Sequence, residues 1–143
     1  MSVRTYDPKQ VICTIGGVPI SGYTEGTFIE VARNEPTWSM IVGSDGLVTR
    51  SKTNNFSGTL TITLKQSSPS NDVLSGFLAL DEATNSGIVP VLVKDISGNS
   101  IYFSARAWIN QYPNSTFGKD ITDRTWTLSM DEADIFVGSN SLS

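Results

Sequence analysis

The stretch Gly58–Lys65, GTLTITLK, decides the fold because leucine and isoleucine alternate in it with threonine without a break. Successive side chains of a β-strand point to opposite faces, so this stretch predicts a strand with two different faces. Its apolar row, which must be buried, is Leu60, Ile62 and Leu64, and its hydroxyl row is Thr59, Thr61 and Thr63. The hydroxyl row is uncharged, and it could face bulk water, a ligand or a channel.

A second stretch near the C-terminus, residues 124–130 (RTWTLSM), repeats this pattern. Its apolar row is Trp126, Leu128 and Met130, and its hydroxyl row is Thr125, Thr127 and Ser129. An ordinary half-solvated sheet would explain both rows, but exposed faces usually mix in lysine and glutamate. We expect Lys65 and Arg124, near the ends of the rows, to pair with Asp131 or Glu30.

The rest of the chain predicts further β-strands and one helix. Gly16-Gly17 between two short apolar runs indicates a hairpin, and so does Ser97-Gly98-Asn99 between residues 88–96 and 101–112. In the second hairpin we expect one face to carry Ile101, Phe103, Ala105, Ala107 and Ile109. The predicted fold class is therefore mostly β, an antiparallel sandwich or barrel with one flanking helix.

The helix is expected over about residues 69–86. Ser68 is a suitable capping residue, Pro69 suits the first helical position, and Gly87 is a suitable stop. Leu74, Phe77 and Leu78 share a face at helical spacing.

The segment of about residues 35–54 has more apolar side chains than a surface loop needs, among them Trp38, Met40, Ile41 and Val42. A turn signal, Ser44-Asp45-Gly46, lies near its middle. The segment is either a hairpin packed on the core or a long excursion that leaves the body of the domain. Exposed apolar groups of this kind usually mark a partner surface, whereas a local satellite cluster would bury them.

Composition excludes several classes of function. The 143 residues fit one domain, residues 1–143, and the formal net charge of −4 argues against binding to a phosphate backbone. There is no histidine and a single cysteine, Cys13, which we expect to be a buried small hydrophobe. We therefore predict no enzyme, no metal site and no cofactor. No apolar run is long enough for a membrane span, and the N-terminus has no secretory signal, so we expect folding in the cytoplasm.

Three stretches resemble the tail tube (inner tube) proteins of contractile-tail bacteriophages, which are related in fold to the type VI secretion tube protein. They are YDPKQVICTIGGVPISGYTEGTFIEVARNEP (residues 6–36), VGSDGLVTRSKTNNFSGTLTITLKQSSPSNDVLS (42–75) and GKDITDRTWTLSMDEADIFVGSN (118–140). The resemblance covers nearly the whole chain. It implies a hexameric ring whose inner strands join into one continuous β-barrel, with rings stacked into a tube that carries DNA.

The resemblance also implies roles for particular residues. Lumen-lining positions would be Thr59, Thr61, Thr63, Thr125, Thr127 and Ser129. Residues 35–54 match the long inter-ring loop, with stacking candidates Trp38, Met40, Ile41, Val42 and Arg50. The helix would lie on the outer side of the tube wall and turn Asp72, Asp81 and Glu82 toward the sheath.

The resemblance further implies a virion protein of the tail, assembled in the host cytoplasm. Its partners would be other copies of itself, the tail sheath protein, baseplate and tail-terminator proteins, and within the lumen the tape measure protein and genomic DNA. Two alternatives stay open. One is a monomeric carbohydrate-binding β-sandwich with Tyr102, Trp108 and Tyr112 as an aromatic platform. The other is the tube of a sheath-less tail or of a secretion system.

Overall fold

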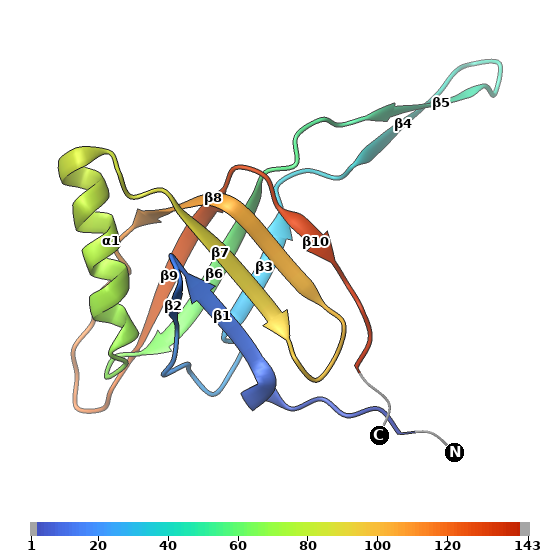
Figure 1. Cartoon of the computed structure of the whole chain (residues 1–143). Helices are drawn as coiled ribbons and strands as arrows, with labels where there is room; N and C mark the ends of the chain where they lie inside the picture. The colour runs from blue at the N-terminus through green and yellow to red at the C-terminus, as the bar shows by residue number, and fades with distance from the viewer. Residues whose placement is uncertain (1–2, 141–143) are drawn as a thin grey trace.

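A computed structural model describes residues 3–140, and its main feature is an eight-stranded antiparallel sheet (Figure 1). The order of the strands is β2-β1-β7-β8-β9-β6-β3, and β10 pairs with β8 beside this path. The strands are β1 (Val11–Ile15), β2 (Val18–Pro19), β3 (Ile29–Arg33), β6 (Gly58–Lys65), β7 (Val89–Asp95), β8 (Ile101–Gln111), β9 (Asp123–Met130) and β10 (Asp134–Phe136). A short 3-10 turn, η1 (Pro8–Gln10), precedes β1. The mostly β fold with one flanking helix is confirmed.

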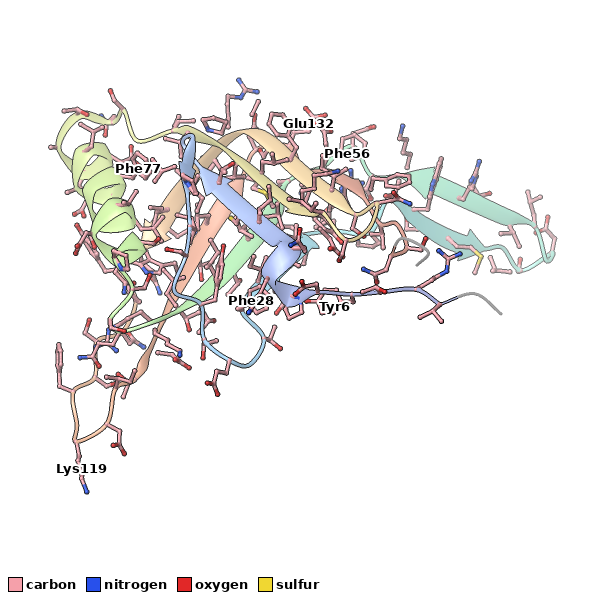
Figure 2. All side chains as sticks on the ribbon, turned by 60° about the horizontal axis from the view of Figure 1, so that its bottom comes forward. Tyr6, Phe28, Phe56, Phe77, Lys119 and Glu132 are labelled. Carbon is pink, nitrogen blue, oxygen red and sulfur yellow. The ribbon has the colours of Figure 1, made fainter. Side chains whose placement is uncertain are left out.

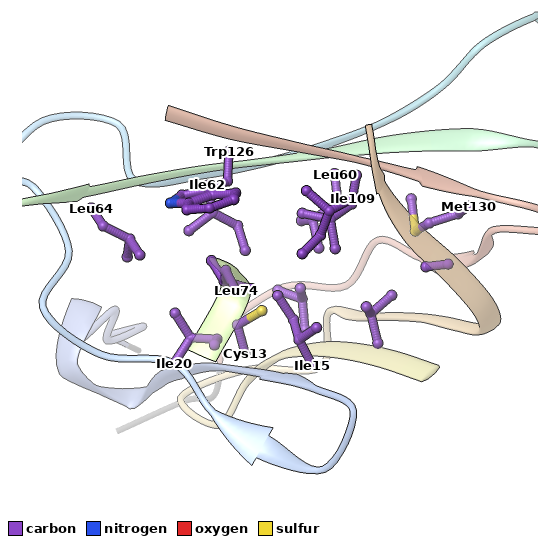
Figure 3. Packing of buried hydrophobic residues seen from close by; sticks show 14 of the residues in the cluster. Cys13, Ile15, Ile20, Leu60, Ile62, Leu64, Leu74, Ile109, Trp126 and Met130 are labelled. Carbon is purple, nitrogen blue, oxygen red and sulfur yellow. The ribbon is translucent and has the colours of Figure 1, made fainter. Parts of the chain in front are cut away.

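The sheet folds over so that β6 and β9 face β1 and β7 across the core (Figure 3). Leu60, Ile62 and Leu64 are fully buried, as the alternation of GTLTITLK predicts. Trp126 is buried beside them, and its Nε1 donates a hydrogen bond of 2.9 Å to Oδ1 of Asn71. Cys13 is only 1% exposed, and burial raises its pKa from 9.0 to about 12. The prediction of a buried cysteine is confirmed.

Helix α1 (Ser70–Thr84) packs against one end of the sheet through Leu74 and Leu78. Oγ of Ser68 accepts the N–H of Ser70 at 3.2 Å, so Ser68 caps the first turn as expected. The helix ends earlier than predicted because Asn85 adopts the left-handed conformation (φ 59°) and its N–H bonds to the Asp81 carbonyl. Asparagine tolerates this conformation better than most residues, so it replaces Gly87 as the stop.

The hairpin of β7 and β8 turns at Ser97-Gly98-Asn99 as predicted, but β8 does not present one continuous apolar face. Val91 lies opposite Ser104 and Val89 opposite Ala107, so β8 has one more residue than β7 in this interval. Such a bulge reverses which side chains face the core. Ala107 and Ile109 are buried as expected, whereas Phe103 is 40% exposed and Ser104 is buried in its place. The expected single row was therefore wrong for its first half.

Residues 38–52 form a separate hairpin that projects from the body of the protein (Figure 1). Its strands, β4 (Trp38–Val42) and β5 (Val48–Lys52), pair only with each other among the described strands, and every residue in them is exposed. The turn is closed by the Gly43 N–H on the Leu47 carbonyl (2.8 Å) and by the Leu47 N–H on Oδ1 of Asp45 (3.0 Å). Of the two possibilities, the segment is thus the excursion; we call β4–β5 with its turn the arm.

Candidate functional site: a hydroxyl-lined sheet face and a projecting arm

The two hydroxyl rows predicted from sequence lie side by side on one face of the sheet. In the antiparallel register, Thr61 lies opposite Thr127 and Thr63 opposite Thr125, with 3.5 Å between the two Oγ1 atoms of the second pair. Thr59 lies opposite Ser129. Like side chains therefore meet across the strands, and the six residues form one continuous surface, which we call the hydroxyl face.

The hydroxyl groups at one end of this face bond to neutral amides. Oγ1 of Thr59 donates to Oδ1 of Asn34, and Oγ of Ser129 donates to Oδ1 of Asn110, each at 2.9 Å. Trp108 lies opposite Ser129 and shares this face. Trp108 and Asn110 were not assigned to the face from sequence, because nothing in either strand indicates that β8 pairs with β9.

Charged residues lie at the margins of the hydroxyl face. Glu30 on β3 is exposed opposite Thr61, and Lys65 lies opposite Asp123 at the end of the strand pair. These groups leave the centre uncharged and give the margins no excess of positive charge. A polyanion would therefore find no cluster of cations to bind on this face.

Arg124 is not part of the hydroxyl face, contrary to expectation. It is 6% exposed on the side of Trp126, where it donates to the Thr116 carbonyl (3.0 Å) and to Oγ1 of Thr122 (2.6 Å). The expected pairing of Lys65 or Arg124 with Asp131 was also wrong, because Asp131 forms an ion pair with Arg106 at 2.5 Å.

Within the described residues, two strand sides that flank the hydroxyl face have no partner strand: the outer side of β3 and one side of the end of β8. β3 pairs only with β6, so its other side is free. The N–H groups of Thr63 and Asn34 bond to carbonyls across this pair, at Phe28 and Ser57. Because antiparallel pairing alternates, the N–H of Val31 points away from β6. β8 is an interior strand, but β7 begins beside Ala107, so residues 108–111 of β8 extend beyond β7 on that side.

The arm holds all the residues predicted to stack. Trp38, Met40 and Val42 lie on one side of β4, and the register adds Val48, Arg50 and Lys52 of β5 to that side. The Arg50 guanidinium lies 3.9 Å from the centroid of the Trp38 ring, a cation–π contact. Ile41, 69% exposed, lies on the other side. The arm is thus an apolar surface with two positive charges that contacts no core of its own.

The helix presents two of its three predicted acids to solvent. Asp72 and Glu82 are exposed, whereas Asp81 is partly buried and its Oδ1 accepts the N–H of Gly87 at 3.1 Å. Asp81 therefore has a local contact at the end of the helix.

The three aromatic residues of the carbohydrate alternative do not form a platform. Tyr102 precedes the bulge and lines a cleft with Val93, while Trp108 follows the bulge on the hydroxyl face. Tyr112 packs edge-on against Trp126, with centroids 6.2 Å apart. Within residues 3–140, no group of histidine, cysteine or acidic side chains is arranged to hold a metal ion, and no helix there is long and apolar enough to span a membrane.

Comparison with known proteins points to one structural family. The family described as "Bacteriophage PhiTE tail tube protein" matches residues 4–138. "Structural protein ORF10" of Pseudomonas phage KPP10 is 34% identical over 144 residues, which covers 95% of this chain and 83% of that protein.

Solved structures share the fold at low identity. A chain of the anti-feeding prophage cap (AFP tube terminating cap) superposes with a TM-score of 0.65 at 11% identity, covering 95% of this chain and 94% of that one. A chain of the PVC sheath-tube complex of an extracellular contractile injection system, in its extended state, gives 0.63 at 13% identity, covering 92% and 91%. A chain of the PVC sheath/tube terminator gives 0.53 at 13% identity, covering 93% and 97%.

Proposed function

Because this chain belongs to the bacteriophage PhiTE tail tube protein family, we propose that it forms hexameric rings that stack into a tube carrying DNA inside a contractile sheath. A phage tail tube protein is a structural component of the virion tail, and the prediction that the chain is not an enzyme is confirmed by the family. The observation that carries the finer proposal is the uncharged hydroxyl face, flanked by the unpaired sides of β3 and of residues 108–111 of β8.

Ring formation would use these two unpaired sides. The free side of β3 in one copy pairs with residues 108–111 of β8 in the next, which continues the sheet from copy to copy. Unpaired edges are a liability in an isolated protein, and closure into a barrel removes them. Because the two contacting surfaces differ, the contact between copies is heterologous. Such a contact gives a ring when the rotation from each copy to the next adds up to a full turn.

The hydroxyl face would line the bore of that barrel. Thr59, Thr61, Thr63, Thr125, Thr127 and Ser129 then present small polar groups to the passing DNA. Hydroxyl groups keep the wall hydrated, and the lack of clustered cations prevents retention of phosphate. The tape measure protein would fill the same bore before DNA does.

The remaining surfaces would contact the other tail components. The arm, with Trp38, Met40, Ile41, Val42 and Arg50, contacts the adjacent ring, and the exposed side of α1, with Asp72 and Glu82, faces the sheath. Asp81 was also assigned to the sheath, but its bond to Gly87 makes it the weakest of the three candidates. Baseplate and tail-terminator proteins would close the two ends of the tube. Residues 1–143 act as one tail-tube domain, assembled in the host cytoplasm.

A proline at Val31 tests ring closure. Val31→Pro removes the outward N–H of β3 and blocks strand addition at this edge. Val31→Ala is the matched control, because it loses the packing of the side chain but keeps the N–H. We expect rings from Val31→Ala and only single copies from Val31→Pro, measured by native mass spectrometry and negative-stain microscopy. Rings from Val31→Pro would show that this edge is not the ring contact.

A sheath-less tube of the same fold is the remaining alternative. Co-sedimentation of assembled tubes with the purified sheath protein separates the two, because only a tube that works inside a sheath retains it.

A further inference from the structure

A cleft with a volume of about 510 Å³ opens between β3 with its preceding loop on one side and β1, β7 and β8 on the other. Its lining combines apolar and aromatic side chains, among them Tyr6, Phe28, Ile29, Val31 and Tyr102, with the polar residues Thr27, Asp95 and Ser100. Figure 2 labels Tyr6 and Phe28 close to each other near the middle of the view. The cleft's volume is within the roughly 300–1,000 Å³ usual for binding clefts.

The walls of this cleft are preformed. The ring of Phe28 packs against Tyr23, with centroids 4.9 Å apart, and Ile29 and Val31 rest on the hydrophobic core. Tyr6 is 55% exposed at the margin. Asp95 is the one charged residue in the lining. The cleft therefore suits a ligand with apolar side chains and positive charge.

The arm has that composition. The side bearing Trp38, Met40, Val42 and Val48 also bears Arg50 and Lys52, and neither strand of the arm contains an acid. Two other clefts fit less well. One is lined by Arg124 and lies under residues 112–117, and the other is lined by Lys9. In either cleft, the arginine or lysine of the lining would repel Arg50 and Lys52 of an inserted arm.

The arm and the cleft lie apart, at opposite ends of β3. Figure 1 shows the arm leaving beyond the C-terminal end of β3, whereas the cleft is lined by the N-terminal half of that strand and the loop before it. A projection at one end and a recess at the other produce a head-to-tail contact that repeats without closing, as a stacked tube requires.

We propose that the arm of one copy inserts its apolar side into this cleft of a copy in the neighbouring ring. The inference rests on the proposed tube, and it adds the receiving site. Arg50 and Lys52 then approach Asp95 while Trp38 and Met40 contact the aromatic lining.

Cysteine cross-linking tests this contact in the assembled protein. Cys13 is buried and its raised pKa keeps the thiol protonated, so only introduced cysteines react readily with maleimides. In the double variant Met40→Cys/Thr27→Cys, one cysteine lies on the arm and one in the lining of the cleft. Each copy then has one reactive cysteine on its arm and one in its cleft. A short bismaleimide should therefore link many copies in series, which gives a ladder of bands on a denaturing gel.

The control pairs the same arm cysteine with one on the helix, Met40→Cys/Glu82→Cys, and should give no ladder.

A second measurement uses Tyr6→Ala, which should raise the critical concentration for tube formation at least about tenfold while rings persist. Its control is Phe117→Ala, at an aromatic residue that is 79% exposed, which should leave the critical concentration unchanged.

Tubes that give no ladder, or that form equally well with Tyr6→Ala, overturn the assignment of this cleft. A ladder with the helix control would also overturn it. If the unmodified protein forms neither rings nor tubes, the proposed function itself fails; rings or tubes without arm-to-cleft links reject only the receiving site.

Discussion

Replacing Trp38 by alanine should prevent tube formation while leaving the subunit folded. Trp38 is 45% exposed on the arm, and its stabilising contact within the subunit is with Arg50 at 3.9 Å. An exposed cation–π pair is worth only about 0.5–1 kcal/mol, whereas a buried tryptophan replaced by alanine costs about 3–5 kcal/mol. The free energy of unfolding should therefore fall by about 1 kcal/mol or less, and the melting temperature by only a few degrees.

The same substitution should have a larger effect between rings. Aromatic residues at the centre of an interface commonly contribute about 2 kcal/mol or more when truncated, which corresponds to at least about 30-fold in an equilibrium constant. Every arm in a ring loses this contact at once. The equilibrium constant for stacking two rings therefore falls by this factor once for each arm. We expect rings without long tubes at concentrations where the unmodified protein assembles fully.

The assay combines thermal melting by circular dichroism with sedimentation of tubes over a concentration series. Leu80→Ala is the control, because Leu80 has almost the same exposure (47%) but lies on the helix. A Trp38→Ala subunit that unfolds would place Trp38 in a structural role. A folded variant that forms tubes at the normal concentration would remove the arm from the stacking contact.

Three further predictions concern the bore and the core. Thr61→Arg should fold and assemble but slow DNA ejection, with Thr61→Ser near normal; normal infection by phage carrying the arginine would contradict a lumen position. Leu60→Ala should lower the free energy of unfolding by about 2–5 kcal/mol in urea titrations, since Leu60 is fully buried; a loss below about 1 kcal/mol would contradict its place in the core. Because burial raises the pKa of Cys13, the unfolded chain loses its thiol proton at lower pH than the folded chain does. The free energy of unfolding should therefore fall as pH rises from about 9 toward 12. Cys13→Ala should reduce the slope of this fall. An unchanged slope in Cys13→Ala would refute this assignment.

Much of the sheet could be predicted from period-two alternation. The rows of residues 58–65 and 124–130 fixed which side chains are buried, because each strand has one face on the core. The same alternation places Arg124 on the side of Trp126, but Arg124 was expected near the end of the hydroxyl rows because nothing in the sequence indicates its carbonyl partner in the 112–122 loop. That partner lies eight residues earlier in an irregular loop, and the course of this loop has no signal in the local sequence.

Other features could not be predicted because they depend on tertiary geometry. The extra residue in β8 changes the direction of the side chains after Ser104, and nothing in the sequence of that strand marks the position. Whether residues 35–54 pack on the core or project from it depends on the ends of β3 and β6, where the chain leaves the sheet. The cleft brings together residues from the N-terminal segment, β3 and the β7–β8 hairpin, which no linear motif connects.

The central claim is that this chain assembles itself into a tube through its own edges and arm. Negative-stain electron microscopy of the purified protein over a concentration series tests it most directly. We predict hollow rings, and at higher concentration long tubes with an open bore. Compact single particles at every concentration, also after addition of the baseplate protein that starts the tube, would contradict the account.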